Sequence, residues 1–227
     1  MTTPITPTTP SPSPTAFGSD TQPTAPVVAI RRRTVDTVLI ALGAVAAVVF
    51  GVAGGLLTWG ANFADDYVGR ELGAQQVFFP DEAALVDEGR EDLVKFAGEQ
   101  VTTGDEAEAY ASYIDGHLQG IADGATYAEL GAVQGEARAA VTAATEEGAS
   151  EDEIAELQAT VDEITSQRDT LFRGETLRGL LLSTYAWSTI GTIAGIAAIV
   201  AFVAAGLMAV LVVAGLVHLR RAHRPTS

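Results

Sequence analysis

The chain has 227 residues, no cysteine and a formal net charge of −16, from 29 acidic and 13 basic residues. Without cysteine it has no disulfides, thiolate chemistry or cysteine-ligated zinc. The acidic balance argues against nucleic-acid binding, which needs a basic surface.

The chain opens with a stretch rich in proline and threonine. Seven of the nine prolines lie in the first 26 residues, and Pro4, Pro7 and Pro10 have the spacing of an extended polyproline segment. Such a composition buries too little apolar surface to fold, so residues 1–33 are predicted to be a disordered cytoplasmic tail. A spacer without a specific partner is the simplest interpretation, and phosphorylation or partner binding at its Thr-Pro and Ser-Pro pairs is the alternative.

The first strongly apolar segment, residues 36–60, is predicted to be a transmembrane helix. Its uncharged run from Val38 to Leu57 meets the roughly 20 residues that a helix needs to cross a bilayer. Small residues recur at every fourth position and therefore share one helix face: Gly43, Ala47, Gly51 and Gly55. This face predicts close packing with the second span or with another chain.

An acidic segment, residues 61–185, follows. It holds 27 Asp/Glu and 7 Lys/Arg, which give a net charge of −20. Three capping boxes, each a Ser or Thr followed three residues later by Glu, predict a mostly helical segment: Thr103 with Glu106, Thr126 with Glu129, and Ser150 with Glu153. The helix after Thr126 is expected to end at Gly148.

The helix after Ser150 carries apolar residues at spacings of three and four, interrupted by Arg168: Ile154, Leu157, Val161, Ile164 and Leu171. This seam covers little more than two heptads, so an antiparallel helical hairpin is favoured over a coiled coil. The same helix is expected to lead into the second span, with Gly174 and Gly179 as soft points. Only Gln75–Phe79 is predicted to be extended.

Five side chains are candidates for a partner-binding surface: Phe78, Phe79, Tyr110, His117 and Tyr127. Phe78 and Phe79 stand out in a segment poor in aromatics; packing into a membrane-proximal core is favoured for both, and a partner-binding anchor is the alternative. His117 is the only histidine of the segment, which excludes an iron site of two histidines and one carboxylate within one chain. It is expected at the edge of an apolar helix face, and a ligand role shared with Asp115 is the alternative.

No group of residues predicts catalysis. The acidic clusters lack the alternating ligands and the glycine turn of a calcium loop, so they are expected to form a solvated surface. The sequence also has no phosphate-binding loop, dinucleotide fingerprint or nucleophile elbow. We therefore expect a protein that is not an enzyme and has no cofactor, metal site or small-molecule substrate.

The second apolar run, Gly179–Val217, has 39 uncharged residues, more than one span requires. Its first part is placed at the outer interface, and residues 188–217 are predicted to be the second transmembrane helix. Gly191 and Gly195 provide a second small-residue face. Trp59, Tyr185 and Trp187 are expected to form an interfacial aromatic belt on the outer side.

The basic residues indicate the orientation. Three arginines, Arg31 to Arg33, precede the first span, and three more lie in the basic tail, residues 218–227. Segments rich in Lys and Arg stay cytoplasmic, so both termini are predicted to be cytoplasmic and the acidic segment extracytoplasmic, at the plasma membrane. The uncharged spans argue against an ion path, a proton relay or a voltage sensor.

Four stretches form a recognisable pattern: Gly54–Glu71, with a Thr-Trp pair at the end of the first span, Tyr110–Leu118, Thr126–Leu130 and Thr176–Ala186. This pattern resembles that of a family of actinobacterial two-pass membrane proteins. The resemblance covers about residues 43–217 and implies the two-pass architecture, although the hairpin between about Val133 and Arg173 is longer than is usual in that family. Some members carry an aromatic ring-opening dioxygenase label, and such chemistry needs iron ligands that this segment lacks.

These features predict an all-α membrane protein in which two transmembrane helices flank a mostly helical, acidic extracytoplasmic domain with a helical hairpin. The expected function is that of an interaction or accessory subunit of a larger envelope complex. Its small-residue helix faces would contact a protein partner or further copies of the chain. A sensor or binding module for a cation or a cationic ligand is the alternative.

Overall fold

The computed structural model describes residues 32–221, and within them the regular structure is helical apart from one isolated bridge. Two helices are long and apolar enough to cross a membrane, α1 (Arg32–Gln75) and α5 (Glu151–Arg221). The all-helical class with two candidate spans is thereby confirmed. The predictions for the proline-rich tail and for residues 222–227 lie outside the described residues.

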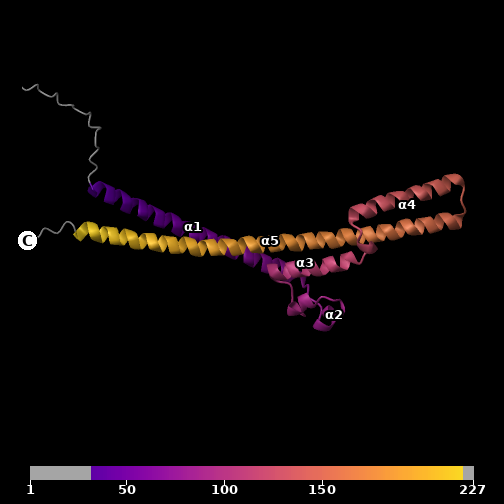
Figure 1. Ribbon diagram of the computed structural model, residues 1–227, viewed down its shortest axis with the longest axis horizontal. Helices are drawn as coiled ribbons and strands as arrows, with labels where there is room; N and C mark the ends of the chain where they lie inside the picture. The colour runs from indigo at the N-terminus through magenta and orange to yellow at the C-terminus, as the bar shows by residue number, and fades with distance from the viewer. Residues whose placement is uncertain (1–31, 222–227) are drawn as a thin grey trace, which may run out of the picture.

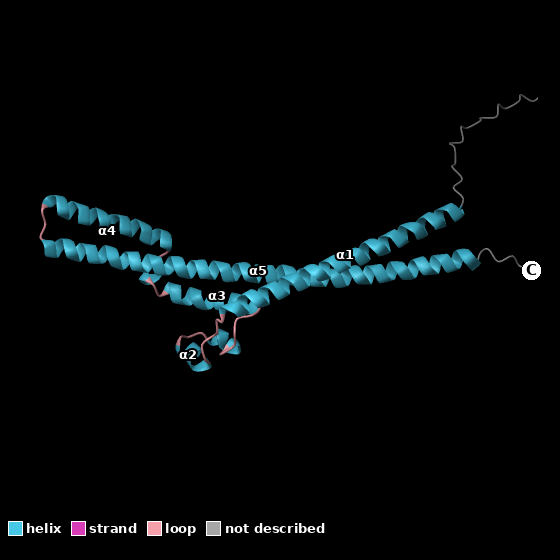
Figure 2. Cartoon of the chain, turned by 180° about the vertical axis from the view of Figure 1, so that it is seen from behind, coloured by secondary structure: helices cyan, strands magenta, loops and turns pink. Residues whose placement is uncertain are grey.

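The molecule is built along one helix. α5 has 71 residues, a length of about 105 Å, and extends along the whole molecule (Figure 1). Three helices pack on it in succession, α1 on its C-terminal part, α3 (Gly104–Gln119) near its middle and α4 (Tyr127–Glu147) on its N-terminal part. The start of α1 and the end of α5 lie at the same end of the molecule, as two passes through one membrane require (Figure 2).

One stripe of α5 makes these contacts. Its buried or half-buried positions recur every three, four or seven residues: Val161, Ile164, Leu171, Gly174, Leu181, Ser188, Gly191, Ala198, Ala201, Met208, Val212 and Gly215. Such a repeat keeps a single stripe towards the neighbouring helix, as in left-handed helix pairs. The predicted seam is therefore the first part of a much longer stripe, and α4 covers it in the predicted antiparallel hairpin.

Small residues allow α1 and α5 to approach closely. A methyl group added at Gly54 would lie 3.0 Å from the Phe202 ring, and one at Gly191 would lie 3.0 Å from the Cβ atom of Ala64. Each side chain fills the space that the opposite glycine leaves open. Such interdigitation would hold the two helices together inside a bilayer, where the hydrophobic effect does not favour helix association.

The structure corrects the start of the extended stretch and bears out the expected continuation of the hairpin helix into the second apolar run. α1 continues past residue 60 to Gln75, so the extended stretch begins only after Gln76, and its pairing is limited to a bridge between Phe78 and Gln100. α5 passes through Gly174 and Gly179 without a break. The absence of a side chain at Gly174 makes room for Leu118 of α3, so this glycine serves close packing rather than bending.

The predicted caps are present. Thr103 and Thr126 form complete capping boxes, and Gly148 ends α4 in the left-handed conformation with φ 72°. The Ser150 hydroxyl accepts a hydrogen bond from the backbone N–H of Glu153 at 3.3 Å, one of the two bonds of a box. The remaining elements are the short helix α2 (Glu82–Asp87) and two 3-10 helices, η1 (Glu91–Phe96) and η2 (Ala122–Gly124).

Candidate interaction groove

Residues 76–103, with α2 and η1, form a small lobe that projects from one side of the helical rod (Figure 1). Its core centres on Phe79, whose ring stacks on Phe96 with centroids 5.2 Å apart and meets the edge of Tyr110 at the same distance. Val68 and Leu72 of α1 belong to the same cluster. The lobe is therefore packed against both α1 and α3.

Arg90 ties the far side of the lobe to α3. Its guanidinium donates to the backbone oxygen of Ser112 at 2.9 Å, to the Ser112 hydroxyl at 2.8 Å and to both carboxylate oxygens of Asp92. The hydrogen bond to Asp92 raises the pKa of Arg90, and the side chain is 17% exposed. Shielded, charge-assisted bonds of this kind hold the lobe in a defined position.

A groove with a volume of about 460 Å³ opens where the lobe, α1, α3 and α5 meet. Its walls are mainly apolar and include Leu72, Val77, Val101, Ile114, Leu177 and Leu180. Leu177 and Leu180, on α5, are 55% and 61% exposed. Glu71, Gln75 and Thr184 add polar groups to this surface. An apolar concave surface with a few polar groups is the usual form of a binding site.

The groove lies beyond the aromatic residues that follow the first span. Trp59, Phe63 and Tyr67 stack along α1 with successive centroid distances of 5.8 and 6.1 Å, and Leu72 comes more than one turn after Tyr67. On α5, Thr184 is about one turn beyond Trp187 on the side away from the span. Trp187 is exposed and Tyr185 half-buried.

The five candidate partner residues do not form one exposed surface. Phe79 is 3% exposed inside the lobe, whereas Phe78 is 54% exposed, because successive side chains of an extended segment point to opposite sides. Tyr110 lines the groove and also contacts the lobe core. Tyr127 belongs to α4, where its ring lies 4.3 Å from the guanidinium carbon of Arg168. Of the five, the groove contains only Tyr110.

His117 lies on the outer face of α3 with more than half of its side chain exposed. Its Nδ1 atom is 3.1 Å from the backbone oxygen of Tyr113, and its Nε2 atom is 3.7 Å from a carboxylate oxygen of Glu88. Burial and the Glu88 carboxylate raise the pKa of Tyr113 to about 12. Asp115, the suggested co-ligand, instead lies 3.4 Å from Arg178 of α5. Within residues 32–221 there is no group of three or more His, Asp or Glu side chains placed to hold a metal ion.

Comparisons with protein-family models, with curated proteins and with solved structures found no match to this chain.

The predicted packing glycines divide into two sets. A methyl group added at Gly43 would lie 3.0 Å from Val212, and one at Gly195 would lie 3.7 Å from Ala61. Together with Gly191 they line the contact between α1 and α5, and Ala47 is half-buried nearby on α1. At Gly51 and Gly55 an added methyl group would meet nothing within 4 Å. Gly54, which the sequence analysis did not single out, lies on the contact face instead.

Sequence reasoning also missed Leu177 and Leu180. Leu177, Leu180, Leu181 and Thr184 have the spacing of one helix face and precede the predicted span. That spacing was a usable signal for a binding surface outside the membrane. The signal was overlooked because the uncharged run that begins at Gly179 was assigned to the membrane interface before the span.

Proposed function

We propose that the protein is a two-pass plasma-membrane protein with both ends cytoplasmic and the segment between the spans outside. Two apolar helices support this placement, because arginines precede the apolar run of the first and follow the apolar run of the second. The resemblance to actinobacterial two-pass proteins is consistent with it and rests on the sequence stretches alone.

We further propose that the extracytoplasmic part is a non-enzymatic interaction subunit of an envelope complex. The groove beside Leu177 and Leu180 carries this proposal, because it exposes leucine side chains beyond the aromatic belt, where lipid does not cover them. Exposed apolar surface in water marks a site where another protein binds. The charge of −20 over residues 61–185 favours a partner with a basic surface around an apolar anchor.

Affinity purification of the full-length protein in mild detergent, followed by quantitative mass spectrometry, tests the proposal. We expect a partner in near-equimolar amount and its loss, by at least tenfold, in Leu180→Glu. Leu180 is exposed, so this substitution leaves the free energy of unfolding within about 0.5 kcal/mol.

Leu182→Glu is the matched control, because Leu182 lies two residues away on a different side of α5 and does not line the groove. Equal recovery of the partner with both variants would contradict the assignment to the groove. Recovery of the protein alone from cross-linked membranes would contradict the accessory-subunit proposal. No observation in the described residues gives comparable support to the cation sensor.

A further inference from the structure

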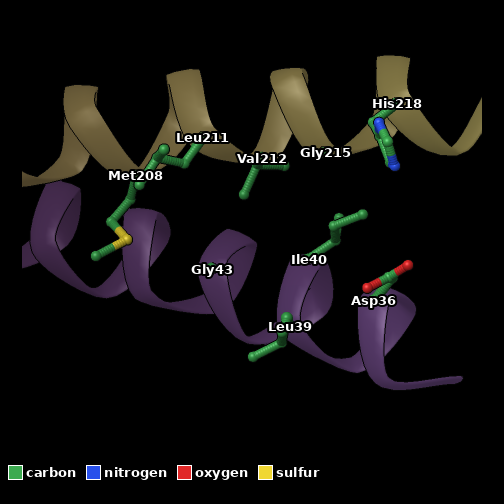
Figure 3. A pocket seen from close by; sticks show the side chains of 9 residues that line it. All are labelled: Asp36, Leu39, Ile40, Gly43, Met208, Leu211, Val212, Gly215 and His218. Atoms are coloured by element: carbon green, nitrogen blue, oxygen red, sulfur yellow. The ribbon is translucent and has the colours of Figure 1, made fainter. Parts of the chain in front are cut away.

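A second cavity, of about 330 Å³, lies between the cytoplasmic ends of α1 and α5. Figure 3 shows it bounded by Leu39 and Ile40 on one helix and by Met208, Leu211 and Val212 on the other. Asp36 and His218 point towards each other across its outer end (Figure 3). The cavity is therefore apolar along the span and polar where the span ends.

Two glycines shape the cavity. A methyl group added at Gly43 would lie 3.0 Å from Val212, and one added at Gly215 would lie 2.8 Å from Ile40. The helices touch at these points but diverge towards their cytoplasmic ends (Figures 1 and 2). Leu39 and Leu211 remain largely exposed at the side, so the cavity is open laterally.

The position of the cavity in the span decides what fills it. Residues 38–43 and 208–217 belong to the uncharged runs, so the cavity opens into the hydrocarbon of the cytoplasmic leaflet. Water there would lack hydrogen-bonding partners, and an empty cavity would forfeit dispersion contacts. A lipid acyl chain satisfies the apolar walls.

The basic residues at the adjacent ends of the two helices favour an anionic headgroup. Arg32 and Arg33 lie in the first turn of α1, and Arg220 and Arg221 in the last turn of α5. With Asp36 the five groups have a net charge of +3, and basic pockets between transmembrane helices on the cytoplasmic side favour anionic lipid headgroups.

We propose that this cavity binds one acyl chain of an anionic glycerophospholipid, with the lipid phosphate held near the ends of α1 and α5, where the arginines of the sequence cluster. The proposal rests on the membrane placement given above, and it does not depend on the partner-binding groove. The expected preference for anionic lipid distinguishes this site from the rest of the lipid-facing surface, where any phospholipid is accepted.

Tryptophan quenching in bilayers tests it with the full-length chain. The two native tryptophans are Trp59 and Trp187, both in the outer half, and are replaced by phenylalanine. Leu211→Trp then reports from the cavity, and Val213→Trp reports from the same depth on another side of α5. The bilayer is an equimolar mixture of phosphatidylglycerol and phosphatidylcholine, with bromine on the chains of one lipid or the other.

At Leu211→Trp we expect brominated phosphatidylglycerol to quench the fluorescence more strongly than brominated phosphatidylcholine does. The apparent preference for phosphatidylglycerol should be about fivefold or more, which is the contribution of a single juxtamembrane arginine. Arg220→Gln with Arg221→Gln should remove most of the preference, while Arg173→Gln, far along the rod, should leave it unchanged. Equal quenching by the two lipids at Leu211→Trp would overturn the proposal. So would an equal preference at Val213→Trp, which would show a general attraction of anionic lipid without a site.

A failure of the membrane placement would look different, because neither reporter would then be quenched. Circular dichroism on each variant confirms that its helices are retained. Failure of the lipid-site proposal can therefore be told apart from failure of the proposed topology and from failure of the partner experiment.

Discussion

Glu106 shows how one side chain organises the start of a helix. Its carboxylate accepts hydrogen bonds from the backbone N–H groups of Thr102 at 2.6 Å and Thr103 at 2.9 Å, while the Thr103 hydroxyl accepts from the N–H of Glu106. The cap stands where the lobe meets α3, and Gly104 beside it packs against Ser188 of α5. A local sequence signal thereby positions a tertiary contact.

This cap gives the folded protein a pH dependence. Burial raises the pKa of Glu106, but the hydrogen bonds from Thr102 and Thr103 outweigh it and hold the pKa below the usual 4.5. A lowered folded-state pKa means that the stabilisation is complete above about pH 4.5 and is lost as the pH falls through the folded value.

We expect Thr103→Ala to destabilise α3 by about 1 kcal/mol. Hydrogen exchange of α3 between pH 7 and 3 should show a shallower loss of protection in Glu106→Gln, and identical profiles would contradict this role.

At the scale of elements, the α4–α5 hairpin is held by a polar contact inside an apolar seam. Arg168 donates to the side-chain oxygen of Gln134 at 2.5 Å, and Gln134 donates to the Thr165 hydroxyl at 2.6 Å. The Tyr127 ring covers the guanidinium, whose buried Nε atom has no hydrogen-bond partner. A buried polar contact at one seam position specifies the register of the two helices.

Removing one partner of this contact leaves the other unsatisfied. We expect Gln134→Leu to lower the free energy of unfolding of the hairpin by about 1–3 kcal/mol, and the double variant with Arg168→Leu to lose less than the sum of the two single changes. Chemical denaturation of the four proteins of this cycle measures the coupling. Additive losses would show that Arg168 and Gln134 do not stabilise the hairpin together.

The contact between α1 and α5 offers a matched pair of adjacent glycines. Gly54 is buried against Phe202, whereas a side chain at Gly55 meets open space. We expect Gly54→Leu to destabilise the helix pair by about 1–3 kcal/mol through overpacking, and Gly55→Leu to leave it unchanged. Thermal unfolding in detergent measures both. A loss at Gly55→Leu alone would indicate that this face packs on another chain.

At the scale of the whole molecule, one continuous helix joins the second candidate membrane span to the tip of the hairpin. From Ser188 to Glu151 α5 extends about 55 Å beyond the span. α3 and α4 cover its stripe in turn, so the outer part is a rod and not a flexible loop. The charge of −20 over residues 61–185 opposes the close approach of two copies of this segment.

The absence of cysteine allows the topology to be measured without background. We expect Glu147→Cys, at the tip of the hairpin, to react with a membrane-impermeant maleimide in intact cells, because that end is predicted to lie outside. Thr226→Cys should react only after permeabilisation, since it follows the C-terminal arginines. The reverse labelling pattern would place the rod in the cytoplasm, and labelling of both positions would exclude two-pass insertion.

Much of the helical layout followed from local signals. The capping residues Thr103 and Thr126, the terminator Gly148 and the two uncharged runs each act on their own stretch of chain, so the sequence by itself determined which segments are helical and which are apolar enough to span a membrane. The continuation of α5 into the second apolar run was also predicted, whereas the end of α1 at Gln75 was not, because neighbouring elements stabilise its last turns.

Only the tertiary structure decided which faces meet. Inside the spans nearly every residue is small or apolar, so spacing does not distinguish Gly54, which packs on Phe202, from Gly55, which faces open space. The groove likewise combines Leu72, Val101 and Leu180, which are far apart in the chain and belong to α1, the lobe and α5. Local sequence determines which residues are helical, but it does not encode how far each helix is rotated against its neighbours, and that rotation creates both the groove and the cavity between the ends of α1 and α5.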